Sequence, residues 1–517
     1  MSLVSASFYL FVIVSLILYY IIPHKFQWCV LLAASIAFFC FVGTLWTIIY
    51  PLLSVFITWG CALKIKECND NSKQKSAKKW LVVGLIANIG VLAVLKYSSF
   101  VLMSAEKAIA IVAEKNVSLT LNLLASLGIS FYTLQIVGYL VDCYWGIAEP
   151  QRNPGKLALF TMFFPQMVSG PISRYNQLSN QLFERHSFRW SNIRSGIIRI
   201  IIGTFKKLVL AENIAQILPY FLDVNAGRTG PVAFLGMVGY VIQIYADFAG
   251  CMDIVIGTAQ CFGITMTENF NFPFSSRTIQ EFWQRWHITL GLWLRDYVMY
   301  PLLRSQKWNR LTKWCKKKLG KNASKKIPTH IAMLILWLCM GLWHGGWWNY
   351  IMEGIWFWSV IVIGEWCSPL FQKITSRINT ENIIWIWFQR LRTMLIYAIG
   401  AIMFKFVSVK SCLKMLRDIF SPLWITDLET VKKPIVAFIN SSGWSNVFCI
   451  GLLLSFSFVL FLLESSLKKK GKGLDTLLMG KPILFQIMCL CVIVYLILIF
   501  GVYGPGYNAA DFIYGGF

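Results

Sequence analysis

A run of apolar residues that ends in a histidine decides the fold class of this chain: Leu334-Ile-Leu-Trp-Leu-Cys-Met-Gly-Leu-Trp-His344-Gly-Gly-Trp-Trp-Asn349. Imidazole is the side chain best able to exchange a proton near neutral pH, and a titratable group at membrane depth indicates a functional site by default. His287, in Phe282-Trp-Gln-Arg-Trp-His287, also lies among tryptophans. The two histidines together predict chemistry within or beside a bilayer.

The composition agrees with a membrane protein. Hydrophobic residues make up 57% of the 517 residues, charged residues 14%, and the mean hydropathy is +0.61. Repeated apolar runs near spanning length therefore predict an all-α polytopic membrane protein. The first run, residues 8–22, lacks a basic leader and a small-residue cleavage pattern, so we expect a retained helix.

The fourteen cysteines are scattered and contain no Cys-x-x-Cys pair. Most of them lie inside apolar segments, where small side chains help helices to pack. Nothing in the sequence brings thiols and histidines together at ligand spacing, so no metal site built on the cysteines is expected.

The net charge of +25 would raise the question of nucleic acid in a soluble protein. Here the basic residues concentrate in stretches that we expect to be short hydrophilic connectors between the apolar runs, at 64–79, 304–326 and 468–472. Such stretches stay cytoplasmic, so membrane topology explains the charge and no nucleic-acid partner is predicted. The stretch at 304–326 is also where a phosphate-rich carrier such as coenzyme A would approach.

Apolar runs predict helices along the whole chain, at 7–22, 28–43, 45–63, 80–103, 119–145, 192–222, 231–262, 330–344, 347–366, 383–408, 444–464 and 481–503. The sequence shows no internal repeats that would indicate a repeat architecture. We therefore expect one membrane domain over 1–517, with N-terminal helices in 1–127, a catalytic core in 128–366 and C-terminal helices in 367–517.

Residues 154–176 do not look like a simple span, because Pro165, Gly170 and Pro171 interrupt an apolar segment that is too short to cross. Broken backbone at membrane depth is tolerated only where protein or a water-filled cavity satisfies it. This stretch is predicted to be a re-entrant element that lines a cavity, with Arg174 at its mouth.

Residues 268–300 contain a second irregular stretch. Their aromatic and charged residues favour an interfacial helix from about Thr278, capped by Ser275 or Ser276. Spacing of three and four residues places a polar set on one face of this helix: Gln280, Gln284, His287 and Gly291.

The acids of the central helices need partners. Asp247 and Asp253 lie in an otherwise apolar segment, where an unpaired charge would cost about 2.5–3.5 kcal/mol even on a lenient scale. Pairing with an arginine is favoured over direct catalysis, and the candidates are Arg277, Arg285 and Arg295. The i, i+4 spacing also predicts an ion pair between Glu281 and Arg285.

Two interpretations of His344 remain open, a helix-end histidine bonded to a carbonyl or a catalytic residue. Glycines that allow close approach and tryptophans that wall the ring favour catalysis: Gly341, Gly345, Gly346, Trp343, Trp347 and Trp348. Glu353 follows in the chain and is a candidate to orient the imidazole.

His287 is likewise either an interfacial histidine or a catalyst, and its neighbours Gln284, Arg285 and Arg295 favour a functional role. The other three histidines lie in connectors or at span ends, and no chemistry is assigned to His24, His186 or His330.

Taken together, four motifs resemble the membrane-bound O-acyltransferase family, and in particular the bacterial branch that O-acetylates exopolysaccharides such as alginate. They are Phe164-Pro-Gln-Met-Val-Ser-Gly-Pro-Ile-Ser-Arg174, residues 245–257, residues 271–302 and Leu342-Trp-His344-Gly. The resemblance implies about eleven transmembrane helices, with re-entrant and interfacial helices, around a transmembrane tunnel in the bacterial cytoplasmic membrane. It also implies that His344 is the essential catalytic residue and His287 the second family position.

The expected reaction is acyl transfer from cytoplasmic acetyl-CoA, used as a substrate with no bound cofactor, to a hydroxyl reached from the outer face. His344 would act as the base, and the substrate-binding candidates are Gln280, Gln284, Arg285, Trp343 and Arg174. The family pattern implies an extracytoplasmic, hydrolase-like acetyltransferase partner and a polysaccharide acceptor.

Two alternatives remain open. One is the branch of the same family that supports D-alanylation of teichoic acid. The other is a transporter or flippase of a lipid-linked sugar, which would use broken helices and a midplane polar site. Such a transporter should show related halves, and none are visible in the sequence.

Overall fold

The computed structural model describes residues 2–113, 126–223, 230–376, 379–420 and 473–504, with residues 432, 433, 436, 437, 439, 440 and 451. Secondary structure in this part of the chain is helical, apart from one isolated bridge between Phe270 and Trp286. The helix expected at 444–464 lies outside the described residues except for residue 451. The chain divides into two compact units, Met1–Gly203 with Cys251–Glu268 and Thr204–Gly250 with Asn269–Tyr507.

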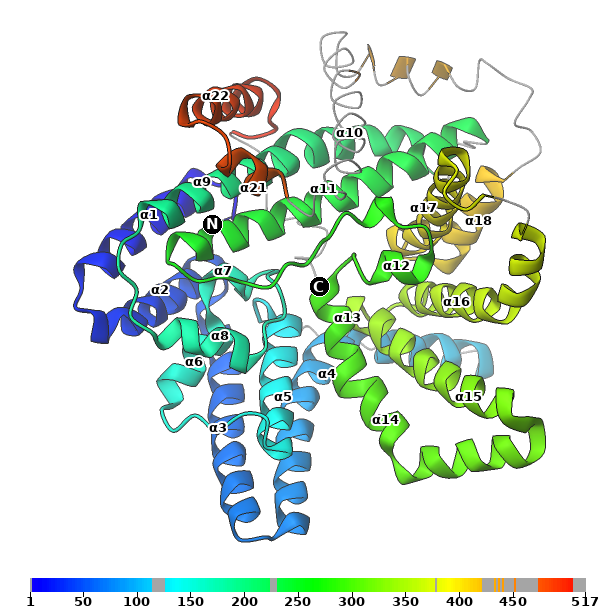
Figure 1. Cartoon of the computed structure of the whole chain (residues 1–517), viewed down its shortest axis with the longest axis horizontal. Coiled ribbons are helices and arrows are strands. Elements are labelled where there is room, and N and C mark those ends of the chain that lie inside the picture. Colours follow the sequence, from blue (N-terminus) through cyan, green and yellow to red (C-terminus); the bar gives the residue numbers. More distant parts are fainter. Residues whose placement is uncertain are drawn as a thin grey trace. The chain divides into compact units, whose positions relative to one another are not determined.

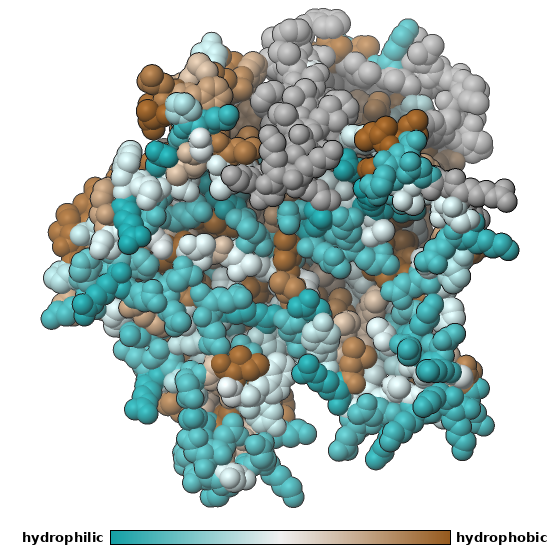
Figure 2. Space-filling model, in the orientation of Figure 1, coloured by the Kyte–Doolittle hydropathy of each residue, from teal (hydrophilic) through white to brown (hydrophobic). Residues whose placement is uncertain are grey.

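Unit 1 begins with long apolar helices: α1 (Ala6–Ile21), α2 (Gln27–Val42), α3 (Ile49–Asp70), α4 (Gln74–Ala113) and α5 (Ile129–Trp145). Helices α3, α4 and α5 lie side by side (Figure 1). Between α3 and α4, Asn88 Nδ2 donates to Thr58 Oγ1 at 2.9 Å inside the buried seam. Hydrophilic residues gather at the turn between these two helices (Figure 2), where the basic stretch 64–79 lies.

The interrupted stretch of unit 1 forms short helices, as predicted: α6 (Pro154–Met162), α7 (Phe164–Met167) and, after an irregular segment, α8 (Tyr175–Phe183). Buried Gln166 satisfies the broken backbone, since its Nε2 donates to Phe160 O at 3.1 Å and its Oε1 accepts from Ser173 Oγ at 3.0 Å. A Cβ at Gly170 would collide with Gln166, so this position requires glycine. Arg174 is the N-cap residue of α8 and is half-buried. Helix α9 (Trp190–Phe205) follows, and the segment Cys251–Glu268 also belongs to this unit.

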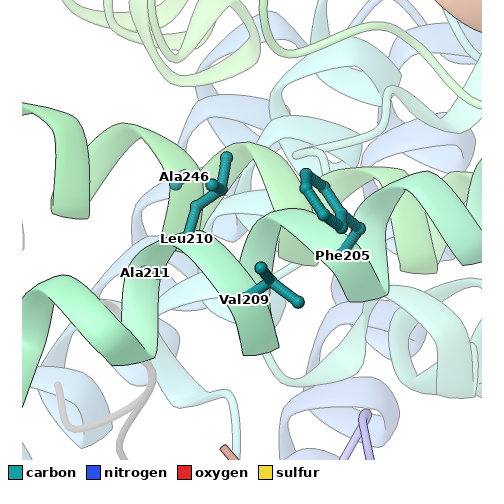
Figure 3. Close-up of a cluster of buried hydrophobic side chains, with 5 residues drawn as sticks. All are labelled: Phe205, Val209, Leu210, Ala211 and Ala246. Atoms are coloured by element: carbon teal, nitrogen blue, oxygen red, sulfur yellow. The ribbon is translucent and has the colours of Figure 1, made fainter. Parts of the chain in front are cut away.

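Unit 2 opens with a π-helical turn, η3 (Lys206–Ala211), followed by α10 (Glu212–Phe221) and α11 (Pro231–Cys261), whose residues from Cys251 onward belong to unit 1. Figure 3 shows the apolar cluster beside this turn, formed by Phe205, Val209, Leu210, Ala211 and Ala246. Residues of the last described helix, α22 (Ile483–Phe500), pack against the cluster, and Val502 N donates to Leu208 O at 3.1 Å. The very apolar α22 is thereby fixed to unit 2.

The rest of unit 2 consists of shorter and longer helices in chain order: α12 (Ile279–Trp283), α13 (Ile288–Leu294), a π-helical turn η5 (Arg295–Met299), α14 (Tyr300–Arg304), α15 (Gln306–His344), α16 (Trp348–Thr375), α17 (Ile383–Lys405), α18 (Val409–Ile419) and α21 (Leu474–Met479). The basic stretch 304–326, expected to be a connector, is helical instead and forms the first part of α15. Lysine and arginine are good helix formers, and Ser305 Oγ caps the helix by accepting from Trp308 N at 3.3 Å. Gly320, with φ 88°, kinks the helix before its apolar part.

Seven helical segments of the described chain are long and apolar enough to cross a membrane: 24–42, 45–70, 74–106, 231–261, 306–344, 348–373 and 483–500. Helix α1 is apolar but has only 16 residues. The described part of the chain is thus helical, and the chain is a multi-pass membrane protein. The larger number of about eleven spans and the tunnel stay predictions.

Candidate active site

The stretch that carries His287 is not one continuous helix. Helix α12 ends at Trp283, and α13 begins only at Ile288, because His287 adopts a left-handed backbone with φ 46° and ψ 49°. Such a conformation interrupts a helix and is rare outside glycine, asparagine and aspartate. The prediction of a shared helical face for Gln280, Gln284, His287 and Gly291 is therefore wrong. The cap is also corrected, since Thr278 Oγ1, not a serine, accepts from Glu281 N at 3.1 Å.

Asn269 holds this break in place. Its backbone carbonyl accepts from Ile288 N at 3.0 Å, and its Oδ1 accepts from Thr289 N at 3.1 Å and from Thr289 Oγ1 at 2.9 Å. His287 Nδ1 lies 3.2 Å from the same Oδ1. Asn269 is fully buried, so these contacts are shielded from water. The strained backbone of His287 is stabilised by one side chain.

The Asn269 contacts define the tautomer of His287. A backbone N–H can only donate, so the atom that Thr289 N approaches is an acceptor, and His287 Nδ1 must donate to it. Burial lowers the pKa of His287 below its usual value, so the ring is neutral near pH 7. Its single proton lies on Nδ1, and the lone pair lies on Nε2.

Aromatic rings surround His287 on two sides. Phe248 of α11 meets it edge to face with ring centroids 4.8 Å apart, and Trp343 near the end of α15 lies 5.4 Å away. His287 is 2% exposed. His287 therefore lies in an apolar, aromatic environment.

His344 is the last residue of α15 and is 3% exposed. Its ring lies 5.2 Å from that of Trp343, 5.1 Å from Phe404 on α17 and 6.2 Å from Tyr350 on α16. Trp343 thus contacts both imidazoles. The structure places the two predicted histidines around a single indole.

The glycines beside His344 serve helix packing. A Cβ at Gly341 would collide with the Tyr350 carbonyl oxygen, and a Cβ at Gly345 would collide with the Tyr350 ring. A Cβ at Gly354 would likewise meet the Trp337 carbonyl oxygen, so α15 and α16 pack closely from both sides. The space that we expected a substrate to use at Gly341 and Gly345 is filled by Tyr350.

The other predicted binding residues differ in their surroundings. Gln280 is half-buried and Gln284 is exposed. Arg285 forms the predicted ion pair with Glu281 at 2.9 Å and also donates to Asn271 O at 3.3 Å, so the protein itself uses its guanidinium. Arg174 belongs to unit 1, whereas the two histidines belong to unit 2.

The acids of α11 are paired, as expected, but with other partners. Asp247 Oδ1 lies 2.5 Å from Lys207 Nζ, which also lies 2.6 Å from Glu212 Oε1. Asp253 Oδ1 lies 3.1 Å from Arg199 Nε in unit 1. The predicted pairing with Arg277, Arg285 or Arg295 is wrong, because Lys207 and Arg199 lie on the neighbouring helical segments, whereas Arg285 pairs with Glu281 and Arg295 with Asp296.

Asn269 is the residue that sequence reasoning missed. Its only signal was a polar side chain directly after a long apolar helix, in the irregular stretch that leads to His287. Within the described residues, no group of three or more histidine, cysteine, aspartate or glutamate side chains is arranged to hold a metal ion. Two buried histidines among aromatic rings suit proton transfer by imidazole in a dry environment.

Comparison with known proteins identifies the family of this chain. The model of the membrane-bound O-acyltransferase family matches residues 153–408, which include both histidines. The chain is similar to "Probable alginate O-acetylase AlgI" of Pseudomonas putida, with 30% identity over 67% of this chain and 67% of that protein. It is also similar to "Peptidoglycan O-acetyltransferase" of Helicobacter pylori, with 32% identity over 63% and 62% of the two chains.

A further relative is "Teichoic acid D-alanyltransferase" of Bacillus subtilis, with 31% identity over 49% of this chain and 61% of that protein. The matches span about two thirds of the length of these curated relatives or slightly less, down to 61%. The family model, the bacterial relatives and the pair of histidines around Trp343 point the same way: the chain belongs to the membrane-bound O-acyltransferase family of enzymes.

Proposed function

We propose that this protein moves an acetyl group from cytoplasmic acetyl-CoA towards hydroxyls of an extracellular polysaccharide. The observation that carries the proposal is the contact of one indole, Trp343, with both His287 and His344. The names of two relatives, an alginate O-acetylase and a peptidoglycan O-acetyltransferase, support acetyl as the acyl group and a sugar polymer as the acceptor.

In the proposed reaction His344 takes the proton of the acceptor hydroxyl while the oxygen attacks the thioester carbonyl. A new C–O bond forms, the C–S bond breaks, and the thiolate of coenzyme A leaves and takes up a proton from the imidazolium. General base catalysis of this kind contributes about 10²–10⁴-fold to a rate. A dry aromatic environment strengthens the electrostatic contacts and limits hydrolysis of the thioester.

The tautomer of the neutral His287 determines which hydrogen bonds it can form with a substrate. Since Nδ1 donates to Asn269, the Nε2 lone pair can accept a hydrogen bond from a hydroxyl or an amide of a substrate. It cannot donate to an oxyanion without a second proton. Indole N–H groups are then the better candidates for stabilising the tetrahedral intermediate, with Trp343 the nearest to both histidines.

The position of His344 on α15 supports an outer acceptor. The part of α15 that follows the basic stretch, residues 327–344, ends at His344, and at about 1.5 Å per residue it spans roughly 27 Å. Its other end adjoins the basic stretch 304–326, which the positive-inside rule assigns to the cytoplasm. His344 would therefore lie towards the outer face, where a polymer hydroxyl arrives, and the basic end would attract the phosphates of coenzyme A.

The proposal includes an extracytoplasmic partner of hydrolase-like fold that receives the acetyl group and passes it to the polymer. D-alanyl transfer is the alternative within the family, and it is less favoured because the D-alanyltransferase match covers 49% of the chain against 67% for the alginate relative. Co-purification from the native membrane tests whether the partner protein binds this chain. Supplying acetyl and D-alanyl donors in parallel tests which acyl group is transferred.

The central experiment uses the full-length protein in lipid nanodiscs with acetyl-CoA and an acceptor oligosaccharide, and it follows release of free coenzyme A thiol. We expect release by the wild type, almost none by His344→Ala and a reduced rate for His287→Ala. The matched control is His330→Gln, another buried histidine of α15, which should keep the wild-type rate. Full activity of folded His344→Ala would refute the base assignment, and substrate uptake without acyl transfer would favour the transporter.

A further inference from the structure

A buried acid lies close to His344 in the chain and takes no part in the proposed chemistry. Glu353 on α16 is 7% exposed, and its Oε2 has no hydrogen-bond partner. Throughout the described ranges, Glu353 forms no ion pair and no hydrogen bond, not even with His344. The expectation that Glu353 orients the imidazole as a carboxylate therefore finds no support in the geometry.

A carboxylate in this position would be an uncompensated charge. Removing one partner of a buried ion pair is strongly destabilising, because the remaining charge is left without compensation. The titratable groups that interact electrostatically with Glu353 are Tyr350 on α16 and Cys412 on α18, which are both uncharged in their ordinary state. With no cation beside it in the described part of the chain, the carboxyl group is expected to hold its proton.

A proton on Glu353 needs an acceptor, and α16 provides one. Asn349 lies one helical turn earlier, is 0% exposed, and its Oδ1 also has no hydrogen-bond partner. Residues four apart on a helix share a face, with Cβ atoms about 5–6 Å apart. A single carboxyl O–H would satisfy both buried oxygens.

Asn349 connects this pair to the wall of the candidate active site. Its Nδ2 donates to Met403 O on α17 at 3.1 Å. The next residue, Phe404, lies 5.1 Å from the His344 ring and 5.2 Å from the Tyr350 ring. A change at Glu353 can thus reach His344 through Asn349 and the end of α17.

We propose that Glu353 is a protonated positioning residue whose carboxyl O–H donates to Asn349 Oδ1 and holds α16 and α17 in register around His344. Its effect on turnover rests on the proposed acyl transfer, but the hydrogen bond itself does not. Glu353 touches no reacting atom in this scheme. Its role is to keep the aromatic wall of the base in place.

The test compares two substitutions. Glu353→Gln replaces the O–H donor by an amide N–H donor, whereas Glu353→Leu removes the donor and leaves Asn349 Oδ1 unsatisfied. We expect Glu353→Gln to stay close to the wild-type rate and pH profile. Glu353→Leu should lower kcat by about tenfold to a hundredfold with little change in KM, the size expected for a slightly misplaced catalytic group.

A second measurement is independent of activity. The infrared spectrum of the full-length protein near neutral pH should contain the carbonyl band of a buried protonated carboxylic acid, and this band should be missing in Glu353→Gln. Thermal unfolding of each variant checks that it is folded. The proposal is overturned if the band is absent from the wild type, or if folded Glu353→Gln loses as much activity as Glu353→Leu, because an ionised carboxylate would then be needed. If the band is present but the wild type transfers no acetyl group, the proposed function fails while the protonated Glu353 stands.

Discussion

Two histidines of α15, one inside the helix and one at its end, show how one residue type serves different purposes on one helix. His330 is 5% exposed, and each of its polar groups has a protein partner. Its Nε2 lies 2.7 Å from Glu365 Oε2, its Nδ1 accepts from Trp366 Nε1 at 3.3 Å, and its carbonyl accepts from Trp358 Nε1 at 2.8 Å. His344 is just as buried, but the rings of Trp343, Tyr350 and Phe404 surround it.

The difference lies in what holds each ring. An indole N–H can only donate, so Nδ1 of His330 carries the lone pair and Nε2–H donates to the carboxylate. Both nitrogens of His330 are used to join α15 to α16, which leaves none for a substrate. The ring of His344 packs against three aromatic rings, those of Trp343, Tyr350 and Phe404. Burial alone does not identify a catalytic histidine, whereas the partners of the ring do.

The largest expected effect is a difference in kcat between substitutions of Trp343, beside His344, and Trp366, beside His330. Trp343→Ala removes the indole between His287 and His344, so we expect kcat to fall by about a hundredfold through misplacement of the catalytic groups. Trp366→Ala, the matched change beside His330, should lower stability but leave the rate per folded molecule unchanged. Thiol release and thermal unfolding of both variants measure this contrast. Equal losses of rate in the two variants would contradict the assignment of His344 to catalysis and of His330 to structure.

A smaller loss is expected when the tautomer of His287 is released. Asn269→Ala removes the acceptor for His287 Nδ1 and for two donors of Thr289, so the ring can reorient. We expect kcat/KM to fall by about tenfold to a hundredfold. Asn269→Asp keeps an acceptor oxygen and should retain more activity than Asn269→Ala. The reverse order of the two variants would show that the tautomer does not matter.

The structural histidine should affect stability and not rate. His330→Leu leaves the Trp366 N–H and the Glu365 carboxylate without their partner, and we expect a loss of about 1–3 kcal/mol in the free energy of unfolding. The rate per folded molecule should be that of the wild type. Unfolding in mild detergent, followed by tryptophan fluorescence, measures the loss. A catalytic defect without a change in stability would place His330 in the chemistry.

The smallest effect concerns pH. Because burial lowers the pKa of His287 in the folded protein, the unfolded chain takes up a proton below about pH 6.5 that the folded chain does not. The stability from burying the neutral ring is therefore complete above that pH and declines below it, by at most roughly 1.4 kcal/mol per pH unit. His287→Gln should show a flatter profile between pH 7 and 5. Parallel profiles of the two proteins would mean that His287 is not buried in its neutral form.

Much of this could be predicted from sequence because the signals were local. Apolar runs gave the membrane class, prolines and glycine marked the broken segment at 154–176, and tryptophans around His287 and His344 marked the site. The basic stretch 304–326 was misread as a connector, because lysine lowers hydropathy while favouring helix. Two features could not be predicted: the partners of Asp247 and Asp253, and the hydrogen bonds of Asn269 with His287 and Thr289. They depend on how segments that are distant in the sequence pack together, and residue spacing does not show this.

The most direct test of the central claim is a structure of the full-length protein determined with a non-hydrolysable acetyl-CoA analogue. If acyl transfer takes place at the two histidines around one indole, the analogue's acyl carbonyl will lie against Trp343, within hydrogen-bonding reach of His344 or of its attacking hydroxyl. Binding of the acyl end beside His330 and Glu365, or in any position out of contact with Trp343, would contradict the account.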